Sequence, residues 1–496
     1  MIQVIIAILF IIFVVFGLAY LVVYKSYTLR DLLVLGLLLY PILFLGRFST
    51  ALKYNFIGHW YLGFELSMVG FLALFIVVKV LSPDSGKMRL FWPIFLSGVL
   101  LLIGLFSGLV NASAIRDYGA VIQAGFRWFV PFLVACAAIS TLPKTPQSSA
   151  RLANSYILVY GILTPLLILV SALFTTYVAQ LMGWDPFGLS ESAGSGFTRG
   201  WTPTGSTISS GMLVVFAYAM VLTRLIRKEN VGFNAFVAVL CVLAVFFTLA
   251  RSVMFALIVF HLFMFKGILW RNFSRIAVSL ALIIIFLVPS LIVLNHWYSF
   301  ERFLMKERES INLRWSSLKA GLTVSLEKPA LGLGPGLLYW EVRQPWGMPG
   351  TTRERVITIR DLPSAKEPHN LYVLAFAETG LVGLAMLGVI LLYWLRRLKA
   401  ARMYSEIYVP ELELDARSYW SMLISFAIFC LTSASILIYP KVSLTMWSAL
   451  LIGLHCASTI ESETLAVEQS SDWSESDYLL ANQTADVESY DEQLVR

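Results

Sequence analysis

Glu367-Pro368-His369-Asn370-Leu371-Tyr372 joins the most polar part of the chain to a long apolar run. A charge-rich segment covers 295–368, and from Leu371 the sequence is apolar for roughly 25 residues, until Arg396-Arg397. A helix of about 20 apolar residues is long enough to cross a bilayer. The stretch therefore predicts a transmembrane helix over 371–395 that begins next to a histidine at the boundary between water and lipid.

The composition shows that the rest of the chain is of the same kind. Of the 496 residues 58% are hydrophobic and only 14% are charged, whereas soluble domains carry about 25% charged residues. Apolar runs of membrane length lie at 2–23, 32–46, 61–81, 90–110, 124–142, 153–176, 208–223, 231–249, 252–269, 276–294, 371–395, 419–438 and 443–458. The sequence therefore predicts an all-α polytopic membrane protein with about 12–13 transmembrane helices. A soluble enzyme is excluded, and no nucleic-acid partner is expected.

Lysine and arginine give the expected orientation, because cytoplasmic loops carry an excess of them. With the N-terminus outside, eighteen basic residues fall in the inner connections and seven in the short outer ones. The eleven basic residues of 295–368 do not count, since long loops are translocated regardless of charge. Residue 369 and the polar segment before it are therefore expected to face outward.

The same pattern divides the chain into four parts. We expect transmembrane helices 1–10 over 1–294, a large periplasmic loop over 295–368, and transmembrane helices 11–13 over 369–458. Within the loop, Ile311, Trp315, Leu318 and Leu322 recur at helical spacing, which predicts an amphipathic helix over 310–325 that lies on the membrane or caps the bundle. The final part, 459–496, holds ten acidic residues and one arginine, which is typical of a disordered cytoplasmic tail.

Three arginines at the predicted outer side are candidate anion ligands. Arg251 separates two apolar runs, and an arginine within a membrane helix costs roughly 2.5–3.5 kcal/mol on insertion scales, so such a residue usually pairs or lines a cavity. A snorkelling arginine at a tight turn is the alternative. Arg199 lies in a glycine-, proline- and tryptophan-rich loop that either binds an anion or simply connects two spans, and Arg314 adjoins the apolar stripe of the amphipathic helix.

The histidines indicate no metal site, because none has a companion at zinc-ligand spacing. His261, ten residues beyond Arg251, is expected to bond within the bundle. His369 either caps or snorkels at a helix start, or acts on a substrate at the membrane surface.

A longer motif favours the second role. His369-Asn370, nine further residues and then Gly380-Leu381-Val382-Gly383 resemble the H-[NSQ]-x9-G-x-x-G signature of the bacterial O-antigen ligase family, which includes O-antigen polymerases. Arg314-Trp315 followed by Glu327 to Gly336 is similar to the segment that precedes the signature in that family.

The resemblance covers roughly 195–395 and extends to two of the arginines. Arg251, and Arg199 before Gly200-Trp201, resemble arginines at corresponding places in the family. The sequence departs from the family at Thr202-Pro203-Thr204, where many members carry an Asn-Pro-Asn-like turn.

The resemblance implies the transfer of a glycan from undecaprenyl diphosphate to an acceptor hydroxyl at the periplasmic face, with no cofactor and no metal. It implies that His369 is the catalytic base of an inverting transfer, and that Arg199, Arg251 and Arg314 bind the diphosphate. Asn370 and Tyr372 would orient the sugar or the histidine.

Three functions stay open within this reading. The first is a polymerase that joins lipid-linked repeat units of O-antigen or exopolysaccharide, which thirteen spans and a divergent loop slightly favour. The second is a ligase that moves finished glycan to lipid A–core or protein, and the third is a flippase or transporter for lipid-linked glycan. The expected partners are the undecaprenyl-diphosphate-linked donor, a glycan or lipid acceptor, the lipid bilayer and other polysaccharide assembly proteins, in the bacterial inner membrane.

Overall fold

The computed structural model describes residues 27–43, 62–80, 91–112, 118–173, 207–248, 250–266, 315, 317–319, 321–323, 325–335, 370–433 and 440–470. Every regular element within these ranges is a helix. The α-helices are α2 (Leu29–Leu43), α4 (Leu62–Val80), α5 (Phe91–Ala112), α6 (Tyr118–Ser140), α7 (Pro146–Tyr156), α8 (Thr164–Leu173), α11 (Thr207–Ile226), α12 (Val231–Phe247), α13 (Arg251–Met264), α18 (Leu371–Tyr408), α19 (Glu413–Phe429) and α21 (Pro440–Ser470). A π-helical stretch, Ile157–Leu163, joins α7 to α8, and a short 3₁₀ turn, Pro410–Leu412, precedes α19.

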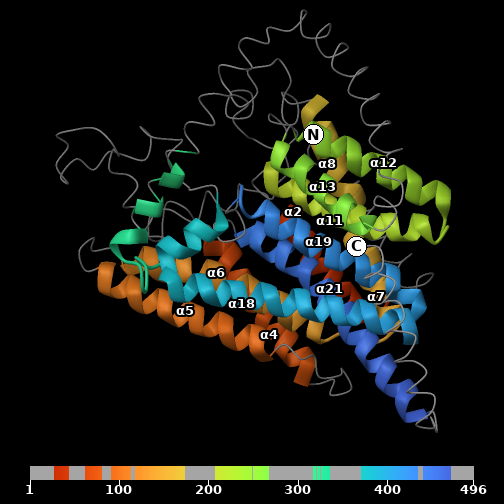
Figure 1. The fold of residues 1–496 in the computed structure, drawn as a ribbon, viewed down its shortest axis with the longest axis horizontal. Helices are drawn as coiled ribbons and strands as arrows, with labels where there is room; N and C mark the ends of the chain where they lie inside the picture. Colours follow the sequence, from red (N-terminus) through yellow and green to blue (C-terminus); the bar gives the residue numbers. More distant parts are fainter. Residues whose placement is uncertain are drawn as a thin grey trace, which may run out of the picture.

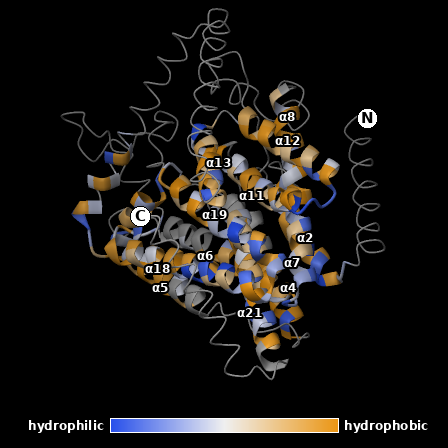
Figure 2. Cartoon of the chain, turned by 45° about the vertical axis from the view of Figure 1, so that its right-hand side comes forward, coloured by the Kyte–Doolittle hydropathy of each residue, from blue (hydrophilic) through white to orange (hydrophobic). Residues whose placement is uncertain are grey.

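Among the described residues, four helical stretches are long and apolar enough to cross a membrane: Pro146–Ala172, Ile208–Ile226, Leu371–Tyr408 and Ser443–Val467. Shorter apolar helices accompany them at Met68–Val80, Ser97–Asn111, Phe129–Ser140, Val231–Phe247 and Arg251–Met264. Hydrophobic residues predominate along these helices (Figure 2). The protein is an all-α polytopic membrane protein, as predicted.

The helices run back and forth between two ends of the bundle (Figure 1). At one end, named here the Arg397 end, ion pairs join neighbouring helices: Arg151 with Asp31 at 3.0 Å, Arg227 with Asp415 at 2.8 Å and Arg397 with Glu461 at 2.7 Å. At the opposite end, the Asn370 end, α18 begins, α5 and α19 finish, and α13 begins.

Helix α21 forms the centre of the bundle, because it packs against α6, α7, α18 and α19. An 18-residue apolar window within Ser443–Val467 is buried throughout. Ser448, Ser458 and Thr459 donate to carbonyls one turn earlier in the same helix. A helix surrounded by protein can carry such hydroxyls because their hydrogen-bonding needs are met locally.

Two helices extend beyond the predicted spans. Helix α18 continues through Arg397 to Tyr408, and α21 continues to Ser470, twelve residues beyond 458. The Arg397 guanidinium donates from Nε and Nη2 to both carboxylate oxygens of Glu461, at 2.9 and 2.7 Å. The bidentate pair allows these two charged residues to lie between packed helices. Hydropathy alone predicts that both helices end before them.

Candidate active site

The structure describes three of the six predicted site residues: Arg251, Asn370 and Tyr372. His369, Arg199 and Arg314 lie outside the described residues. His369 and Arg314 are the sequence neighbours of Asn370 and Trp315, which the structure does describe. The surroundings of these two neighbours therefore define the scaffold of the candidate site.

Asn370 is the N-cap of α18. Its backbone is extended, with φ −145° and ψ 117°, and its Oδ1 accepts from the N–H groups of Tyr372 and Val373, each at 3.0 Å. The first N–H groups of a helix have no partner inside it, and an asparagine at this position supplies one. The cap, one residue after His369, sets the start of the helix at Leu371.

The same end of α18 is tied to the end of α19. The Leu371 N–H donates to the Cys430 carbonyl at 2.8 Å, and Asn370 Nδ2 donates to the Leu431 carbonyl at 3.0 Å. Tyr372 Oη donates to the Ala427 carbonyl at 2.7 Å. One backbone N–H group and two side chains at the start of α18 thus bond three carbonyls at the end of α19, which have no partner inside their own helix. Both predicted orienting residues, Asn370 and Tyr372, contribute to this contact between the start of α18 and the end of α19.

Arg251 is the first residue of α13 and its side chain is exposed. Helix α12 ends at Phe247, and Ala250 takes an extended conformation, φ −98° and ψ 100°, so a tight turn separates the two helices. Ser425 of α19 donates to the Ala256 carbonyl of α13 at 2.5 Å. Since Ser425 lies four residues before the end of α19 and Ala256 five after Arg251, the arginine belongs to the Asn370 end.

Helix α18 is broken at Gly380, where φ is 68° and ψ is −170°. In an unbroken helix the Leu381 N–H would donate to the Ala377 carbonyl, and the Val382 N–H to the Glu378 carbonyl. The break separates both pairs. It leaves a half-helix of nine residues, Leu371–Thr379, between the cap and the glycine.

Residues 329–334 lie in this break and bond the backbone groups of α18 that the break separates. The Leu381 and Val382 N–H groups donate to the carbonyls of Pro329 (2.8 Å) and Ala330 (3.4 Å). The N–H groups of Leu333 and Gly334 donate to the carbonyls of Ala377 and Glu378, each at 2.8 Å. All four backbone groups are therefore satisfied by the chain itself, as a break inside a membrane protein requires.

Glycines make this insertion sterically feasible. A Cβ at Gly332, where φ is +70°, would lie 2.6 Å from the backbone of residues 378–380. A Cβ at Gly380 would overlap the carbonyl group of Ala330, and one at Gly334 would overlap Gly108 of α5. The positive φ and the close backbone approach both require glycine.

Helix α5 holds the inserted segment from its other side. Ser107 Oγ donates to the Gly332 carbonyl at 2.5 Å, and Asn111 Nδ2 donates to the Leu333 carbonyl at 2.9 Å. Asn111 Oδ1 accepts from Lys328 Nζ. The half-helix is thus fixed at its start by α19 and at its end by a segment bound to α5.

Two other polar features belong to the interior. His261 Nδ1 lies 2.8 Å from the Leu257 carbonyl, which only accepts, so Nδ1 carries the proton. Its Nε2 then accepts from Tyr218 Oη at 3.0 Å. His261 bonds within the bundle, as predicted. Within the part of the chain that the structure describes, no cluster of three His, Cys, Asp or Glu residues has metal-binding geometry.

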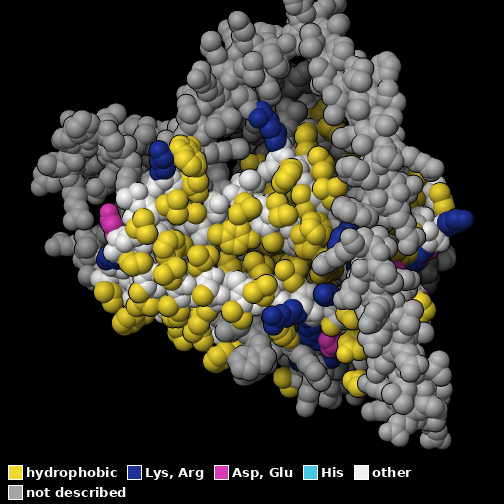
Figure 3. All heavy atoms as spheres, viewed as in Figure 1, with side chains coloured by type: hydrophobic (Ala, Val, Ile, Leu, Met, Phe, Trp, Pro, Cys, Tyr) yellow, Lys and Arg dark blue, Asp and Glu magenta, His cyan; other side chains and the backbone are white. Residues whose placement is uncertain are grey.

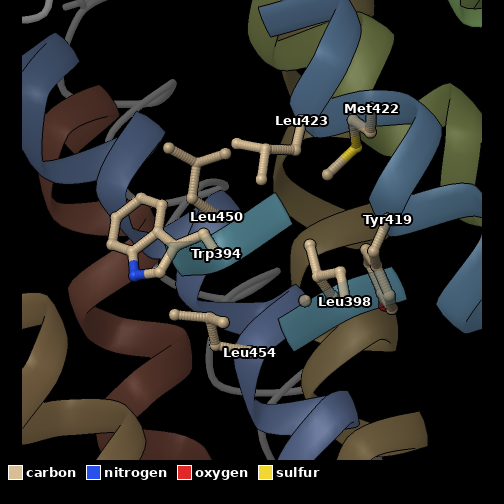
Figure 4. Close-up of a pocket in the computed structure, with 8 residues that line it drawn as sticks. Trp394, Leu398, Tyr419, Met422, Leu423, Leu450 and Leu454 are labelled. Atoms are coloured by element: carbon tan, nitrogen blue, oxygen red, sulfur yellow. The ribbon is translucent and has the colours of Figure 1, made fainter. Parts of the chain in front are cut away.

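A small apolar cavity lies nearer the Arg397 end (Figure 4). It is lined by Trp394, Leu398, Tyr419, Met422, Leu423, Leu450, Gly453 and Leu454. Trp394 is 23 residues beyond Leu371 in α18, which corresponds to roughly 34 Å of helix. The cavity is therefore separate from the candidate site, and its apolar lining suits side-chain packing.

Sequence reasoning missed Ser107 and Asn111, because Ser107 lies within the apolar run 90–110, which is typical of an ordinary span, and Asn111 directly follows that run. The signals for the insertion itself were present. Gly332-Leu333-Gly334 is typical of a tight turn or of a backbone nest for phosphate, and Gly380 with Gly383 allows close helix approach. The structure shows that the two glycine motifs are partners in one contact.

Comparison with known proteins gives one family. The model of the family described as O-Antigen ligase matches residues 236–388, which include α12, α13, the inserted segment and the half-helix of α18. No curated protein matches the chain. The match covers about a third of the chain, including the motifs at Arg251, Arg314 and His369 but not the one at Arg199, and it supports the O-antigen ligase and polymerase family.

Proposed function

We propose that the protein transfers a glycan from undecaprenyl diphosphate to a sugar hydroxyl at the periplasmic face of the bacterial inner membrane. The observation that carries the proposal is the capped, doubly anchored half-helix whose N-cap, Asn370, directly follows His369 in the sequence. Arg251 begins α13 at the same end of the bundle. The family match supports a membrane enzyme that transfers glycosyl groups.

The roles follow from the chemistry of a diphosphate leaving group. His369, neutral near pH 7, takes the proton of the acceptor hydroxyl. The oxygen bonds to the anomeric carbon as the bond from that carbon to the diphosphate oxygen breaks, with inversion. Undecaprenyl diphosphate leaves with the electron pair, and the imidazolium returns its proton to water. Arg199, Arg251 and Arg314 bind the diphosphate and stabilise its growing charge, because guanidinium matches phosphate oxygens bidentately.

Asn370 and Tyr372 act by positioning the histidine. Asn370 Oδ1 accepts two backbone bonds and its Nδ2 donates to Leu431, while Tyr372 Oη donates to Ala427. Side chains used in this way hold the start of α18 against α19. This favours the orientation of His369 over direct binding of sugar.

The polymerase is our first choice of reaction, and the acceptor is then another lipid-linked repeat unit. The description of the matching family favours the ligase as the second candidate, with lipid A–core or protein as acceptor. Both reactions use the same donor chemistry. They differ in which hydroxyl reaches residue 369.

The surface-glycan profile of a deletion strain separates the candidates. Loss of a polymerase leaves products with a single repeat unit, and loss of a ligase leaves full-length polymer on its lipid carrier. Lipid-linked units trapped on the cytoplasmic side would refute both and indicate a flippase.

Purified variants test the residues. We expect His369→Ala to abolish transfer from a lipid-linked donor while the protein elutes as a monodisperse species. Transfer at the wild-type rate would refute the base assignment. Arg251→Ala should weaken binding of undecaprenyl diphosphate. Its matched control is Arg402→Ala, since Arg402 pairs with Glu406, one turn further along α18, at the opposite end of that helix. Equal binding by both variants would remove Arg251 from the site.

A further inference from the structure

The helical stretch 315–327 has one face that packs on the protein. Ser317 and Ser325 are 4% and 0% exposed, and Gly321 between them is also buried. These positions recur every four residues, so they form one narrow stripe of small side chains. The stretch therefore lies close against the rest of the molecule along this stripe.

A second face of the same stretch is apolar and exposed. Trp315, Leu322 and Leu326 are 57%, 39% and 69% exposed. At 100° per residue their directions fall within about 40° of one another. Large apolar side chains gathered on one exposed face indicate an interaction surface. We name Trp315, Leu322 and Leu326 the outer stripe.

Exposed apolar residues also lie on α18 and α5, the two helices bonded to the segment that follows the stretch. Leu331, in that segment, is 38% exposed, and Pro329, two residues earlier, accepts from the backbone of Leu381, itself 55% exposed. On α5, Phe106 and Val110 are 63% and 58% exposed in the last two turns at the Asn370 end. Figure 3 shows hydrophobic side chains over this face with few charged groups among them.

The polar residues of the stretch suit the edge of a bilayer. Lys319 Nζ lies 5.5 Å from the centre of the Trp315 ring, and Lys328 Nζ bonds Asn111 at the end of α5. Tryptophan and lysine are enriched where the acyl chains meet the headgroups, because each combines an apolar body with a polar tip. A protein partner would have to cover the stripe together with lipid-facing surfaces of two transmembrane helices.

We propose that the outer stripe lies among lipid acyl chains, in the membrane leaflet at the Asn370 end. The 315–327 stretch is then an interfacial helix that is anchored on one side by lipid. Beyond its C-terminal end, residues 329–334 anchor it to the break in α18. The leaflet surface thereby sets the depth of the 315–327 stretch relative to the half-helix of α18. The lipid contact itself does not depend on the proposed transfer reaction.

Site-specific quenching in the full-length protein tests the contact. All four native cysteines are buried, so a cysteine introduced at an exposed site can be labelled selectively with a fluorophore. Leu326→Cys places the label on the outer stripe, and Glu327→Cys, one residue on, directs it about 100° away. Leu322→Cys is a second stripe position, which keeps the test decisive if one variant does not fold.

The labelled proteins are reconstituted in bilayers. The quencher is either a spin label on the lipid acyl chains or iodide in the aqueous phase. We expect acyl-chain quenching at 326 and 322 to exceed that at 327 several-fold, with the reverse order for iodide. Equal quenching at all three positions, or stronger iodide quenching on the stripe, would overturn the proposal. Protection of the stripe from both quenchers would also overturn it, because protein would then cover these residues. None of these outcomes requires transferase activity.

Discussion

Replacing Gly380 by alanine tests whether the break in α18 is what joins the half-helix to residues 329–334. Gly380 has φ 68° and ψ −170°, a backbone region used almost only by glycine. Its added Cβ would meet the carbonyl group of Ala330, which is part of the backbone and cannot rotate away. The inserted segment must therefore move out, or α18 must change its path.

The expected loss of stability has two parts. Holding a residue other than glycine in this conformation costs roughly 1–3 kcal/mol. If the segment moves, the bonds from Leu381 to Pro329 and from Val382 to Ala330 are lost, and each contributes about 0.5–1.5 kcal/mol. We therefore expect Gly380→Ala to lower the free energy of unfolding by about 2–6 kcal/mol.

Gly388→Ala is the matched control, because it lies in the same helix and has no atom within 4 Å of an added Cβ. Alanine has the higher helix propensity, so this variant should be neutral or up to about 1 kcal/mol more stable. The free energies are measured by titration with SDS in mixed micelles. Equal stability of the two variants would refute the insertion as a stabilising contact.

Three further variants test the surrounding contacts. Gly334→Ala should destabilise the protein by several kcal/mol in the same titration, because its Cβ would overlap Gly108, and a neutral result would exclude the close contact with α5. Asn370→Ala should cost about 1–2 kcal/mol through the lost cap, whereas Asn370→Asp keeps the accepting oxygen and should cost less; equal losses would contradict the capping role. Arg397→Ala should cost about 3 kcal/mol or less, because one partner of a pair that is only partly buried stays unpaired. A double-mutant cycle with Glu461→Ala that shows no coupling would rule out that pair.

The general fold was predictable because membrane spans are dictated by hydropathy. A polypeptide in lipid must bond its own backbone, and a helix of about 20 apolar residues is the simplest way to do so. The predicted start of α18 at 371 is confirmed. The ends of α18 and α21 were not predicted, because Arg397 and Glu461 neutralise each other only once the two helices pack.

The candidate site was only partly predictable for a similar reason. The resemblance named His369 and the arginines from short motifs, and the roles of His369, Arg199, Arg251, Arg314, Asn370 and Tyr372 stay predictions. Asn111 carries no signal in the sequence, because its role depends on a segment more than 200 residues away. Contacts between distant residues that consist of backbone hydrogen bonds leave almost no trace in residue type, except for the glycines that allow the approach.

The nine-residue spacing between His369-Asn370 and Gly380 therefore has a structural meaning. It is the length of the half-helix, from the cap that binds α19 to the break that receives residues 329–334. A helix turns 100° and rises 1.5 Å per residue, so a spacing of eight or ten would rotate the cap away from α19 or the break away from the inserted segment. The proposed transfer needs a catalytic group with a fixed direction as well as a fixed position. The half-helix suits that need, because its two ends are each bound to a different part of the bundle.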